Sequence, residues 1–423
     1  MSPAAAPGGS GVFTLQVSRS SADISRRVLL RLHRTVVRAS EPDAPRPISK
    51  SLSARVPRWS GLALALLSVG TLGVWALPVE GAVAAGGSPS NATGGTDIGL
   101  QAGFSTGNLI LDDDGPTLAR DLATMSSAGG RWLRLNFSRA NMQPTPTSFN
   151  WAPTDRVVAA ASALGFKIIA VVSYTPVWDR PSGTDWQWGP TNPGHFAAFA
   201  AAAAARYAPR GVRVWEIWNE PNTSQFWSPQ PSPAAYARLL QATSSAIRAT
   251  APGVTILSGG LAAVATTTDG ADISPTAFLS SVYQAGAASA FDGVAAHPYS
   301  YPYLPTDAAG GPWNGFSQLL QLRQIMVANG DSSKSIWLTE YGAPTGTSPQ
   351  AVSQIRQATM VEAAFQQARK WPWVAVLLWY APRDNGIDAT SADDNFGLVS
   401  YDFVPKPSLA AFRFAALGRP WNA

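Results

Sequence analysis

The strongest constraint on the fold is a regular alternation that begins near residue 97, in which short apolar runs are separated by longer alanine-rich stretches. Runs such as KIIAVVS and WVAVLLWY are apolar at nearly every position. This pattern is typical of parallel strands that are covered on both faces. The apolar runs predict strands at 98–104, 131–137, 166–173, 212–219, 254–258, 291–297, 335–341 and 373–380.

The stretches between these runs predict helices. Several begin where a helix start is favoured, as at Ser232-Pro233 and Ser274-Pro275. Eight strand–helix units in about 320 residues match the count and size of a (β/α)8 TIM barrel, which is an α/β fold. The expected helices cover 116–128, 154–164, 194–207, 233–250, 275–285, 314–329, 349–370 and 407–416.

An open, doubly wound sheet is the competing architecture. It would require a glycine-rich phosphate-binding turn after the first strand, and GFSTGNLILDDDGP is a poor match to such a turn. The region shows no internal repeat and no sign of a second domain. We therefore expect residues 97–420 to form a single barrel domain.

An uninterrupted apolar run, GLALALLSVGTLGVWAL, precedes the barrel at residues 61–77. Arg55 and Arg58 come before it and small residues follow it, ending in AVAA at 82–85, which is the order of a secretory signal. An uncleaved membrane anchor is the alternative, because 17 residues lie at the short limit for a spanning helix. The N-terminal part is thus expected to contain a basic tail at 1–60, a signal peptide or membrane anchor at 61–85, and a flexible linker at 86–96.

The positive charge of the chain is concentrated in the basic tail. Residues 1–60 contain ten Lys and Arg and three acidic residues, a net +7, so the remaining chain sums to 5 − 7 = −2. The barrel therefore lacks the basic footprint of a nucleic-acid-binding domain. The chain has no Cys and three His, which excludes a disulfide framework or a thiolate metal site and argues against a His-rich one. We expect neither a metal nor an organic cofactor.

Two glutamates stand near the ends of predicted strands. Glu220 lies in VWEIWNEPN at the fourth strand, and Glu340 lies in IWLTEYG at the seventh. A carboxylate at the end of an apolar strand is costly unless it is used or paired. Active sites of these barrels lie at the carboxyl ends of the strands, so the two carboxylates can converge there. Two carboxylates that flank one bond are the arrangement that glycoside hydrolysis needs.

With these motifs the chain resembles the clan A (β/α)8 retaining glycoside hydrolases over all eight units. In that clan the acid/base Glu follows an Asn at the end of strand 4, and the nucleophile Glu ends strand 7. EIWNEPN together with LTEYG is most similar to family 39, the β-xylosidase and exopolysaccharide hydrolase type, with the cellulase-like family 5 as a near neighbour. The resemblance implies that Glu220 is the general acid/base and Glu340 the nucleophile.

Further positions match the clan one by one and are implied to contact the substrate or the nucleophile. Arg134 stands where the clan has an Arg that contacts the nucleophile. His297 and Tyr299 stand where it has a His and a Tyr nearby. Asn219 is expected to bind the 2-hydroxyl, and Trp379 to form an aromatic floor beneath the sugar.

The third strand departs from the cellulase-like pattern, since it ends in Ser173-Tyr174 where a His is often found, and the exact subfamily is therefore open. Glu216 lies four residues before Glu220 and is expected to join an ion pair inside the barrel. Aromatic rings stack on the apolar faces of sugars, so we expect two or three of six loop aromatics to touch the substrate. These are Trp178, Trp186, Trp188, Phe226, Trp227 and Trp313, with Trp178 and Trp227 as the chosen pair.

The sequence thus predicts a secreted or cell-envelope retaining glycosidase of bacterial type, acting on an envelope or matrix polysaccharide or oligosaccharide. Its partner is a carbohydrate and not a nucleic acid, it touches a membrane only through the N-terminal segment if that segment stays uncleaved, and it is expected to be a monomer. Two alternatives stay open. One is a transglycosylase that uses the same two carboxylates, and the other is a carbohydrate-binding pseudoenzyme. The sugar, the linkage and the choice between endo and exo attack are not predicted.

Overall fold

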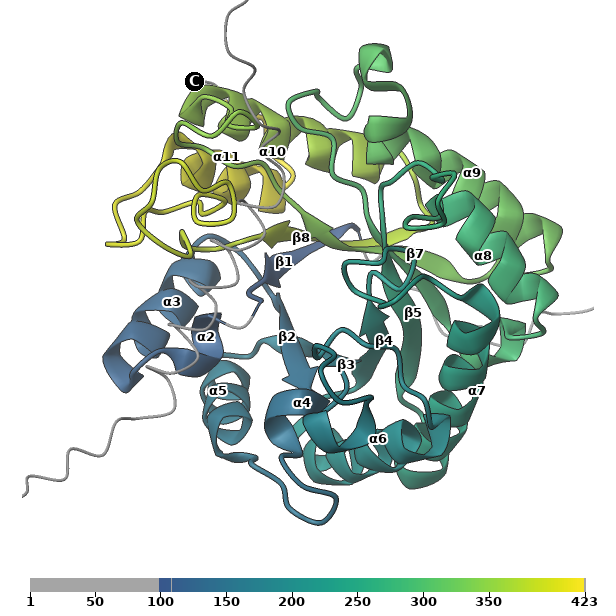
Figure 1. Ribbon diagram of the computed structural model, residues 1–423. Coiled ribbons are helices and arrows are strands. Elements are labelled where there is room, and N and C mark those ends of the chain that lie inside the picture. Colours follow the sequence, from purple (N-terminus) through teal and green to yellow (C-terminus); the bar gives the residue numbers. More distant parts are fainter. Residues whose placement is uncertain (1–98, 108, 422–423) are drawn as a thin grey trace, which may run out of the picture. The chain divides into compact units, whose positions relative to one another are not determined.

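The structure, a computed structural model, describes residues 99–107 and 109–421. Eight parallel strands close into a barrel in the order in which they occur along the chain (Figure 1). The predicted (β/α)8 barrel is therefore confirmed. The strands are β1 (Gln101–Ser105), β2 (Trp132–Ser138), β3 (Lys167–Ser173), β4 (Val214–Asn219), β5 (Thr255–Ala262), β6 (Gly293–His297), β7 (Ser335–Tyr341) and β8 (Val374–Tyr380).

Helices surround the strands as an outer ring (Figure 1). The eight expected helices are all present, with small shifts at their ends. The larger helices are α3 (Gly115–Ser127), α5 (Ala152–Ala163), α6 (Pro193–Tyr207), α7 (Pro233–Thr250), α8 (Pro275–Gln284), α9 (Gly315–Ala328), α10 (Gln354–Arg369) and α11 (Pro407–Ala416). Two short helices, α2 (Leu109–Asp112) and α4 (Arg139–Met142), follow the first two strands and were not expected.

Two apolar layers hold the barrel together. The larger layer lies between the strands and the helices and includes Phe104, Leu133 and Trp215. The smaller layer fills the barrel near the amino ends of its strands, which we call the floor. Its buried members are Trp132, Ile169, Val214, Leu257, Ala295, Val376 and Leu378, with the partly buried Trp337 packed against them.

Strand β5 extends four residues beyond its expected end, because it continues to Ala262 and not to residue 258. Gly259 and Gly260, which follow the expected end, lie inside the strand. A Cβ at Gly259 would lie 2.7 Å from the carbonyl oxygen of Ile217, and one at Gly260 would lie 2.1 Å from Nε2 of His297. Glycine is required here by the close approach of neighbouring groups, which is one of its recognised uses within strands.

The expected tail at 1–60, signal or anchor at 61–85 and linker at 86–96 lie outside the described residues. Within residues 99–107 and 109–421, no helix has the length and apolar character needed to cross a membrane. The N-terminal divisions therefore stay predictions.

Candidate active site

Glu220 is placed by an abrupt change of backbone direction at the end of β4. Trp218 and Glu220 both adopt left-handed conformations, with φ of 74° and 45°. The Glu220 N–H donates to the carbonyl oxygen of Gly260 at 3.0 Å, which ties this turn to β5. The indole of Trp218 is fully buried and donates to the carbonyl oxygen of Phe226 at 2.8 Å. These contacts fix the backbone from which the Glu220 side chain extends.

Glu340 is the last residue but one of β7, where the pairing with β8 is irregular between Leu338 and Tyr341. Tyr341 is fully buried and packs edge-on against Phe316 at 5.1 Å, on the side of the helices. Glu340 instead accepts hydrogen bonds from Tyr299 Oη at 2.9 Å and from Ser105 Oγ at 3.4 Å. Its carboxylate therefore points into the open end of the barrel, which we call the mouth.

Arg134, on β2, connects these elements from below. It is 2% exposed, and its guanidinium donates from Nε and Nη2 to Glu216 at 3.0 and 2.7 Å. Nη2 also donates to Asn219 Oδ1 at 2.8 Å, and Nη1 forms an ion pair with Glu340. The expected interior ion pair of Glu216 is thus confirmed. Because a buried charge must be paired, this network makes carboxylates tolerable inside the barrel.

The surroundings of the Glu340 carboxyl favour its ionised form. Burial alone would raise its pKa, but the electrostatic interactions with His297 and Arg134, with the hydrogen bond from Tyr299, hold the pKa below its ordinary value. Burial, followed by the charge of Glu340, raises the pKa of Tyr299 well above the usual range. Tyr299 therefore stays protonated and donates to Glu340.

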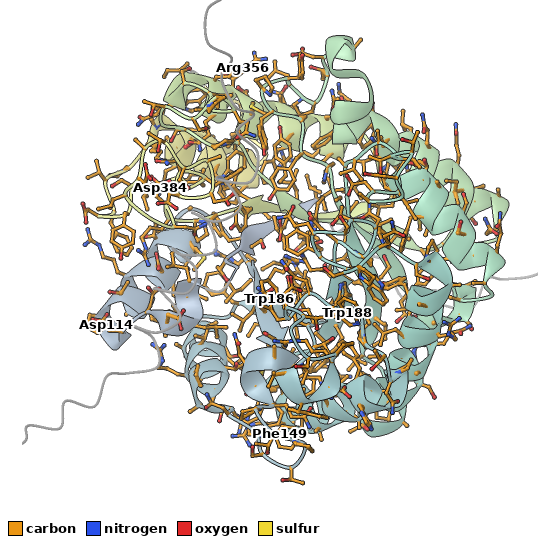
Figure 2. All side chains as sticks on the ribbon, viewed as in Figure 1. Asp114, Phe149, Trp186, Trp188, Arg356 and Asp384 are labelled. Carbon is orange, nitrogen blue, oxygen red and sulfur yellow. The ribbon has the colours of Figure 1, made fainter. Side chains whose placement is uncertain are left out.

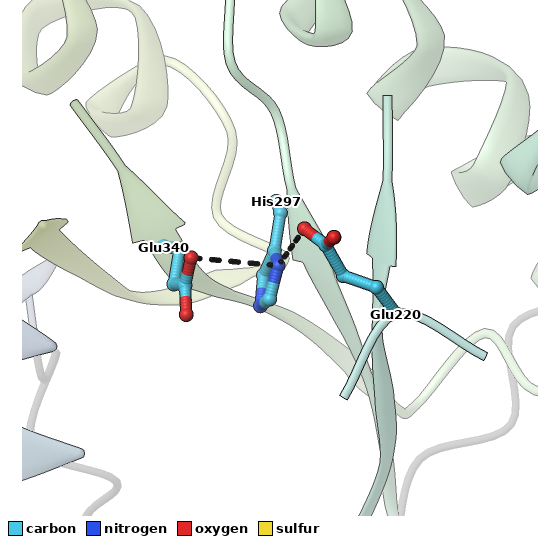
Figure 3. A group of neighbouring side chains, drawn as sticks. All are labelled: Glu220, His297 and Glu340. Atoms are coloured by element: carbon cyan, nitrogen blue, oxygen red, sulfur yellow. Dashed lines mark hydrogen bonds and ion pairs between the residues drawn. The ribbon is translucent and has the colours of Figure 1, made fainter. Parts of the chain in front are cut away.

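His297, at the end of β6, lies between the two glutamates (Figure 3). Its Nδ1 lies 2.8 Å from Oε1 of Glu220 and 3.7 Å from Oε2 of Glu340. The ring is fully buried, and Nε2 has no hydrogen-bond partner among the described residues. Only Nδ1 therefore has an acceptor for a proton, and it directs that proton toward the glutamates.

The two carboxylates approach each other closely in this arrangement. One oxygen of Glu220, one oxygen of Glu340 and a ring nitrogen of His297 all lie within 4.8 Å of one another. Within the described part of the chain, this is the one group of three such side chains with the geometry to hold a metal ion. The guanidinium of Arg134 already forms an ion pair with Glu340, so it would compete with a metal ion for that carboxylate.

The sequence matches the family description "Cellulase (glycosyl hydrolase family 5)" over residues 95–381, which is more than half of the chain. The chain belongs to this family. It is therefore a glycosidase of clan A. A search among curated proteins gave no match to the sequence.

Solved structures support the same relationship. A family 39 glycoside hydrolase from Bacteroides cellulosilyticus superimposes with a TM-score of 0.62 at 25% identity, covering 76% of this chain and 64% of that one. A monomeric β-xylosidase from Caulobacter crescentus gives 0.57 at 20% identity, with 76% and 69% covered. A family 5 subfamily 18 protein from Streptomyces cattleya, in complex with GlcNAc, gives 0.59 at 18% identity, with 76% and 82% covered. The expected resemblance to clan A, with families 39 and 5 as neighbours, is confirmed.

Two of the aromatic residues expected in this glycosidase's sugar site are not available to a substrate. Trp379 is fully buried on the side of the helices, packs edge-on against Tyr341 at 5.7 Å, and donates to the carbonyl oxygen of Phe396 at 3.1 Å. Trp227 is 4% exposed and packs against Trp218 at 5.1 Å. The predictions for Trp379 and Trp227 are therefore wrong, because both rings are covered by protein.

Tyr380 takes the place expected for Trp379. It pairs with Ser105 of β1, whose hydroxyl donates to Glu340 at 3.4 Å. Burial and the charge of Glu340 are the main causes that raise the pKa of Tyr380. Asn385 Nδ2 donates to Tyr380 Oη at 3.1 Å, and the Tyr380 ring packs edge-on against Phe396 at 5.4 Å. The sequence analysis missed Tyr380 because consecutive residues of a strand face opposite sides, and an apolar strand does not reveal which residue faces inward.

Among the other loop aromatics, Trp186 packs against Tyr174, which follows strand β3. Its ring contacts Tyr174 at 4.2 Å and is 36% exposed. The pKa of Tyr174 is raised chiefly by burial, opposed by the charge of Arg134, and raised further by both catalytic candidates. Trp186 and Trp188 overlie the middle of the barrel in Figure 2, whereas Phe149 lies at its edge.

Trp178 lies in the loop after β3. It is half-buried, and its indole donates to the carbonyl oxygen of Gln143 at 2.9 Å. Its substrate contact stays a prediction. The side chain of Trp313 lies outside the described part of the structure.

The long loop after β8 (381–406) closes one side of the mouth. It is fastened by Arg383, which donates to Asp121 at 3.1 Å, and by a buried ion pair of 2.7 Å between Lys406 and Asp384. The same loop presents Asn385 and the exposed Asp393 beside Tyr380. Asp384 thus helps to fasten the loop, whereas Asp393 lies near Tyr380.

Proposed function

We propose that this glycosidase is a secreted, retaining enzyme that cleaves O-glycosidic bonds in an envelope or matrix polysaccharide or oligosaccharide by double displacement. Glu340 is the nucleophile and Glu220 the general acid/base. One observation carries this proposal. An oxygen of each carboxylate lies within 4.8 Å of the other. Retaining glycosidases hold their carboxyl groups about 5–5.5 Å apart, whereas inverting ones need about 6.5–9.5 Å to admit a water molecule.

In the first step, a Glu340 oxygen forms a bond to the anomeric carbon while the bond from that carbon to the leaving oxygen breaks. Glu220 gives its proton to the leaving oxygen. In the second step, Glu220 takes a proton from water, whose oxygen replaces Glu340 at the anomeric carbon. The lowered pKa of Glu340 supports the nucleophilic role, because the attacking group must be ionised. The bond between Glu220 and His297 Nδ1 orients the acid toward the leaving group.

The surrounding residues support a carbohydrate in this position. Arg134 donates a hydrogen bond to Oδ1 of Asn219. The amide NH2 of Asn219 is therefore the group that is free to donate to the 2-hydroxyl of the sugar. That contact strengthens in the transition state. Tyr299 holds Glu340 by its hydroxyl, and Tyr380 supplies an aromatic face beside it. Asp393 and Asn385 lie on the nucleophile side of the mouth, where they meet the hydroxyls of the sugar that becomes bound to Glu340.

A β-linked substrate is proposed from two sources. The residues match a clan whose members include the β-xylosidase named above, and an exo-β-1,4-mannosidase from an Opitutaceae bacterium has the same fold at a TM-score of 0.56. The chain spans 64% of the length of the family 39 protein, so that protein's activity is not carried over as a whole. Export from the cell rests on the sequence of residues 61–85 alone.

The test is a screen of aryl glycosides and cell-envelope polysaccharides, with proton NMR of the first anomer that appears. The proposal expects a product with the same anomeric configuration as the substrate, before mutarotation mixes the two forms. A first product of inverted configuration would refute the double displacement. Adding an acceptor sugar to the same reaction separates hydrolysis from transglycosylation.

A further inference from the structure

The amino ends of the eight strands, together with the loops that lead into them, form the end of the barrel opposite the mouth. We call this surface the base. Parallel strands share one direction, so the loops from each helix to the next strand must all lie at this end. The base comprises residues 128–131, 164–167, 208–213, 251–254, 285–292, 329–334 and 370–373, with residues 417–419 at the end of α11.

The base carries a strong positive charge. Its segments contain seven basic residues and two acidic ones, although the chain beyond residue 60 has a net charge of −2. Both acidic residues are neutralised, Asp292 by Arg248 at 2.7 Å and Asp331 by Lys334 at 2.7 Å. Five basic residues are exposed and form no ion pair with a carboxylate in the described part of the chain. They are Arg131, Lys167, Arg213, Lys370 and Arg419.

These cations are held by their neighbours without being neutralised. Arg131 donates to the carbonyl oxygen of Gly130 at 2.9 Å, and Arg213 donates to that of Pro252 at 3.0 Å. The Lys167 ammonium lies 5.3 Å from the centre of the Trp132 ring. These charges of the base are therefore available to an external anionic partner.

Apolar and amphipathic side chains accompany the charges. Trp371 and Trp373 are half-buried and stacked at 5.0 Å. Leu164 and Leu417 are 50% and 59% exposed. Tryptophan together with Lys and Arg is the combination that is enriched where proteins meet the interface of a lipid bilayer.

The point at which the chain enters the barrel also favours the base as the surface that faces a membrane. Strand β1 begins at Gln101, so the preceding chain joins the barrel at the base. The apolar run at 61–77 precedes this point in the sequence, and the residues between them, 78–98, contain two acidic residues and no basic one.

We propose that the base docks on a membrane surface that contains anionic phospholipids, so that the mouth faces away from the lipid. Clusters of Lys and Arg beside a membrane segment are attracted to anionic headgroups, each basic residue adding to the affinity. The half-buried tryptophans enter the headgroup layer, where their rings are favoured. The catalytic end is then presented to a polysaccharide that lies outside the membrane.

A site-specific fluorescence experiment on the full chain tests this orientation. The chain has no Cys, so a single engineered Cys carries one label. The variant Ser333→Cys places an environment-sensitive dye on the base, and Ser182→Cys places it on an exposed loop at the mouth. With phosphatidylglycerol vesicles, the label at 333 is expected to shift to the blue and to be quenched by lipid-borne quenchers. The label at 182 is expected to stay unchanged, and pure phosphatidylcholine vesicles are expected to give neither response.

A charge comparison completes the test. The base variant combines Arg131→Gln, Lys167→Gln and Lys370→Gln, and the matched control combines Arg120→Gln, Arg238→Gln and Arg413→Gln, which are exposed on the helices. The base variant is expected to lose the phosphatidylglycerol-dependent part of vesicle affinity by on the order of 100-fold, and the control by less than about twofold. Both should hydrolyse a soluble aryl glycoside as the parent does.

Three results would overturn the proposal. The first is a label at 333 that does not respond to phosphatidylglycerol. The second is an equal loss of affinity in the base variant and its control, since that would indicate attraction by net charge alone. The third is a response to a soluble polyanion such as dextran sulfate without a response to vesicles, which would assign the base to an acidic polymer.

Discussion

The interior of the barrel is filled by apolar side chains at the floor and by paired polar ones at the mouth. At the floor, Leu257 and Ile169 pack against Trp132 and are fully excluded from solvent. One layer higher in the barrel, Arg134 joins Glu216, Asn219 and Glu340 in one hydrogen-bonded network. The two halves differ in what their contacts achieve. The floor contributes to folding through buried area, whereas the mouth positions charges that would be costly if left unpaired.

This contrast predicts that substitutions in the two halves separate activity from stability. A change at the mouth should lower turnover with a modest effect on unfolding. A change at the floor should lower the free energy of unfolding while turnover of the folded protein stays near that of the parent. The four substitutions below test this separation, and they are arranged from the largest expected effect to the smallest.

The largest effect is expected for Glu340→Gln, which keeps the shape of the side chain and removes the nucleophile. Turnover of an aryl glycoside should fall by more than about 10⁴-fold, because no covalent intermediate can form. Steady-state kinetics measures this loss, and thermal unfolding should show a folded protein. The Glu362→Gln variant, on α10 and away from the mouth, serves as the control. Activity within tenfold of the parent would remove Glu340 from the mechanism.

The second effect belongs to the floor. Leu257→Ala removes a fully buried side chain on β5 and should lower the free energy of unfolding by about 2–5 kcal/mol. Chemical denaturation measures the change, and kcat at a temperature well below unfolding should stay within about twofold of the parent. Leu320→Ala, whose side chain is 48% exposed on α9, should change stability by no more than about 0.5 kcal/mol. A large loss of kcat in Leu257→Ala would show that the floor and mouth are not separable.

The same contrast explains what the sequence could and could not predict. Strand count, order and approximate bounds followed from the apolar runs, and Glu220 and Glu340 were found because a carboxylate stands out in such a run. Which residues of β8 point into the barrel could not be predicted, since an apolar strand covered on both faces has no alternation of polar and apolar residues. Trp379 was therefore chosen in place of Tyr380.

Gly260 shows a second limit of the sequence. The expected end of β5 fell before it, but the strand continues, and the lack of a side chain at this position is required by His297, which lies on another strand. A contact of this kind depends on how two strands pair, and no local pattern of residues reports it. Ser105, which contacts both Arg134 and Glu340, was missed for the same reason.

The third prediction changes the position of His297 through Gly260, without replacing a charged residue. In Gly260→Ala the new Cβ would lie 2.1 Å from Nε2 of His297, so the ring must shift and its 2.8 Å contact with Glu220 must change. The displacement should lower kcat by roughly 10–100-fold, which corresponds to an increase of about 1.4–2.7 kcal/mol in the activation free energy. The comparison variant Gly286→Ala lies in a turn on the base, away from the mouth, and should keep the parent's kcat. Equal kcat values in the two variants would show that the position of His297 is unimportant.

The smallest effect is expected for Tyr299→Phe, which removes one hydrogen bond from Glu340 and keeps the ring. This bond favours the ionised carboxylate, so its loss should raise the pKa of Glu340 toward its ordinary value. Activity needs Glu340 ionised, and the acidic limb of the kcat/KM profile should therefore move to higher pH. The lowered pKa of Glu340 also contributes to stability. A pKa lower in the folded state than in the unfolded one stabilises the fold at neutral pH, and that contribution is lost as the pH falls through the folded-state value. The variant should thus gain less stability than the parent between acidic and neutral pH. An acidic limb that stays in place would mean that the interactions with His297 and Arg134 keep Glu340 ionised without the hydrogen bond from Tyr299.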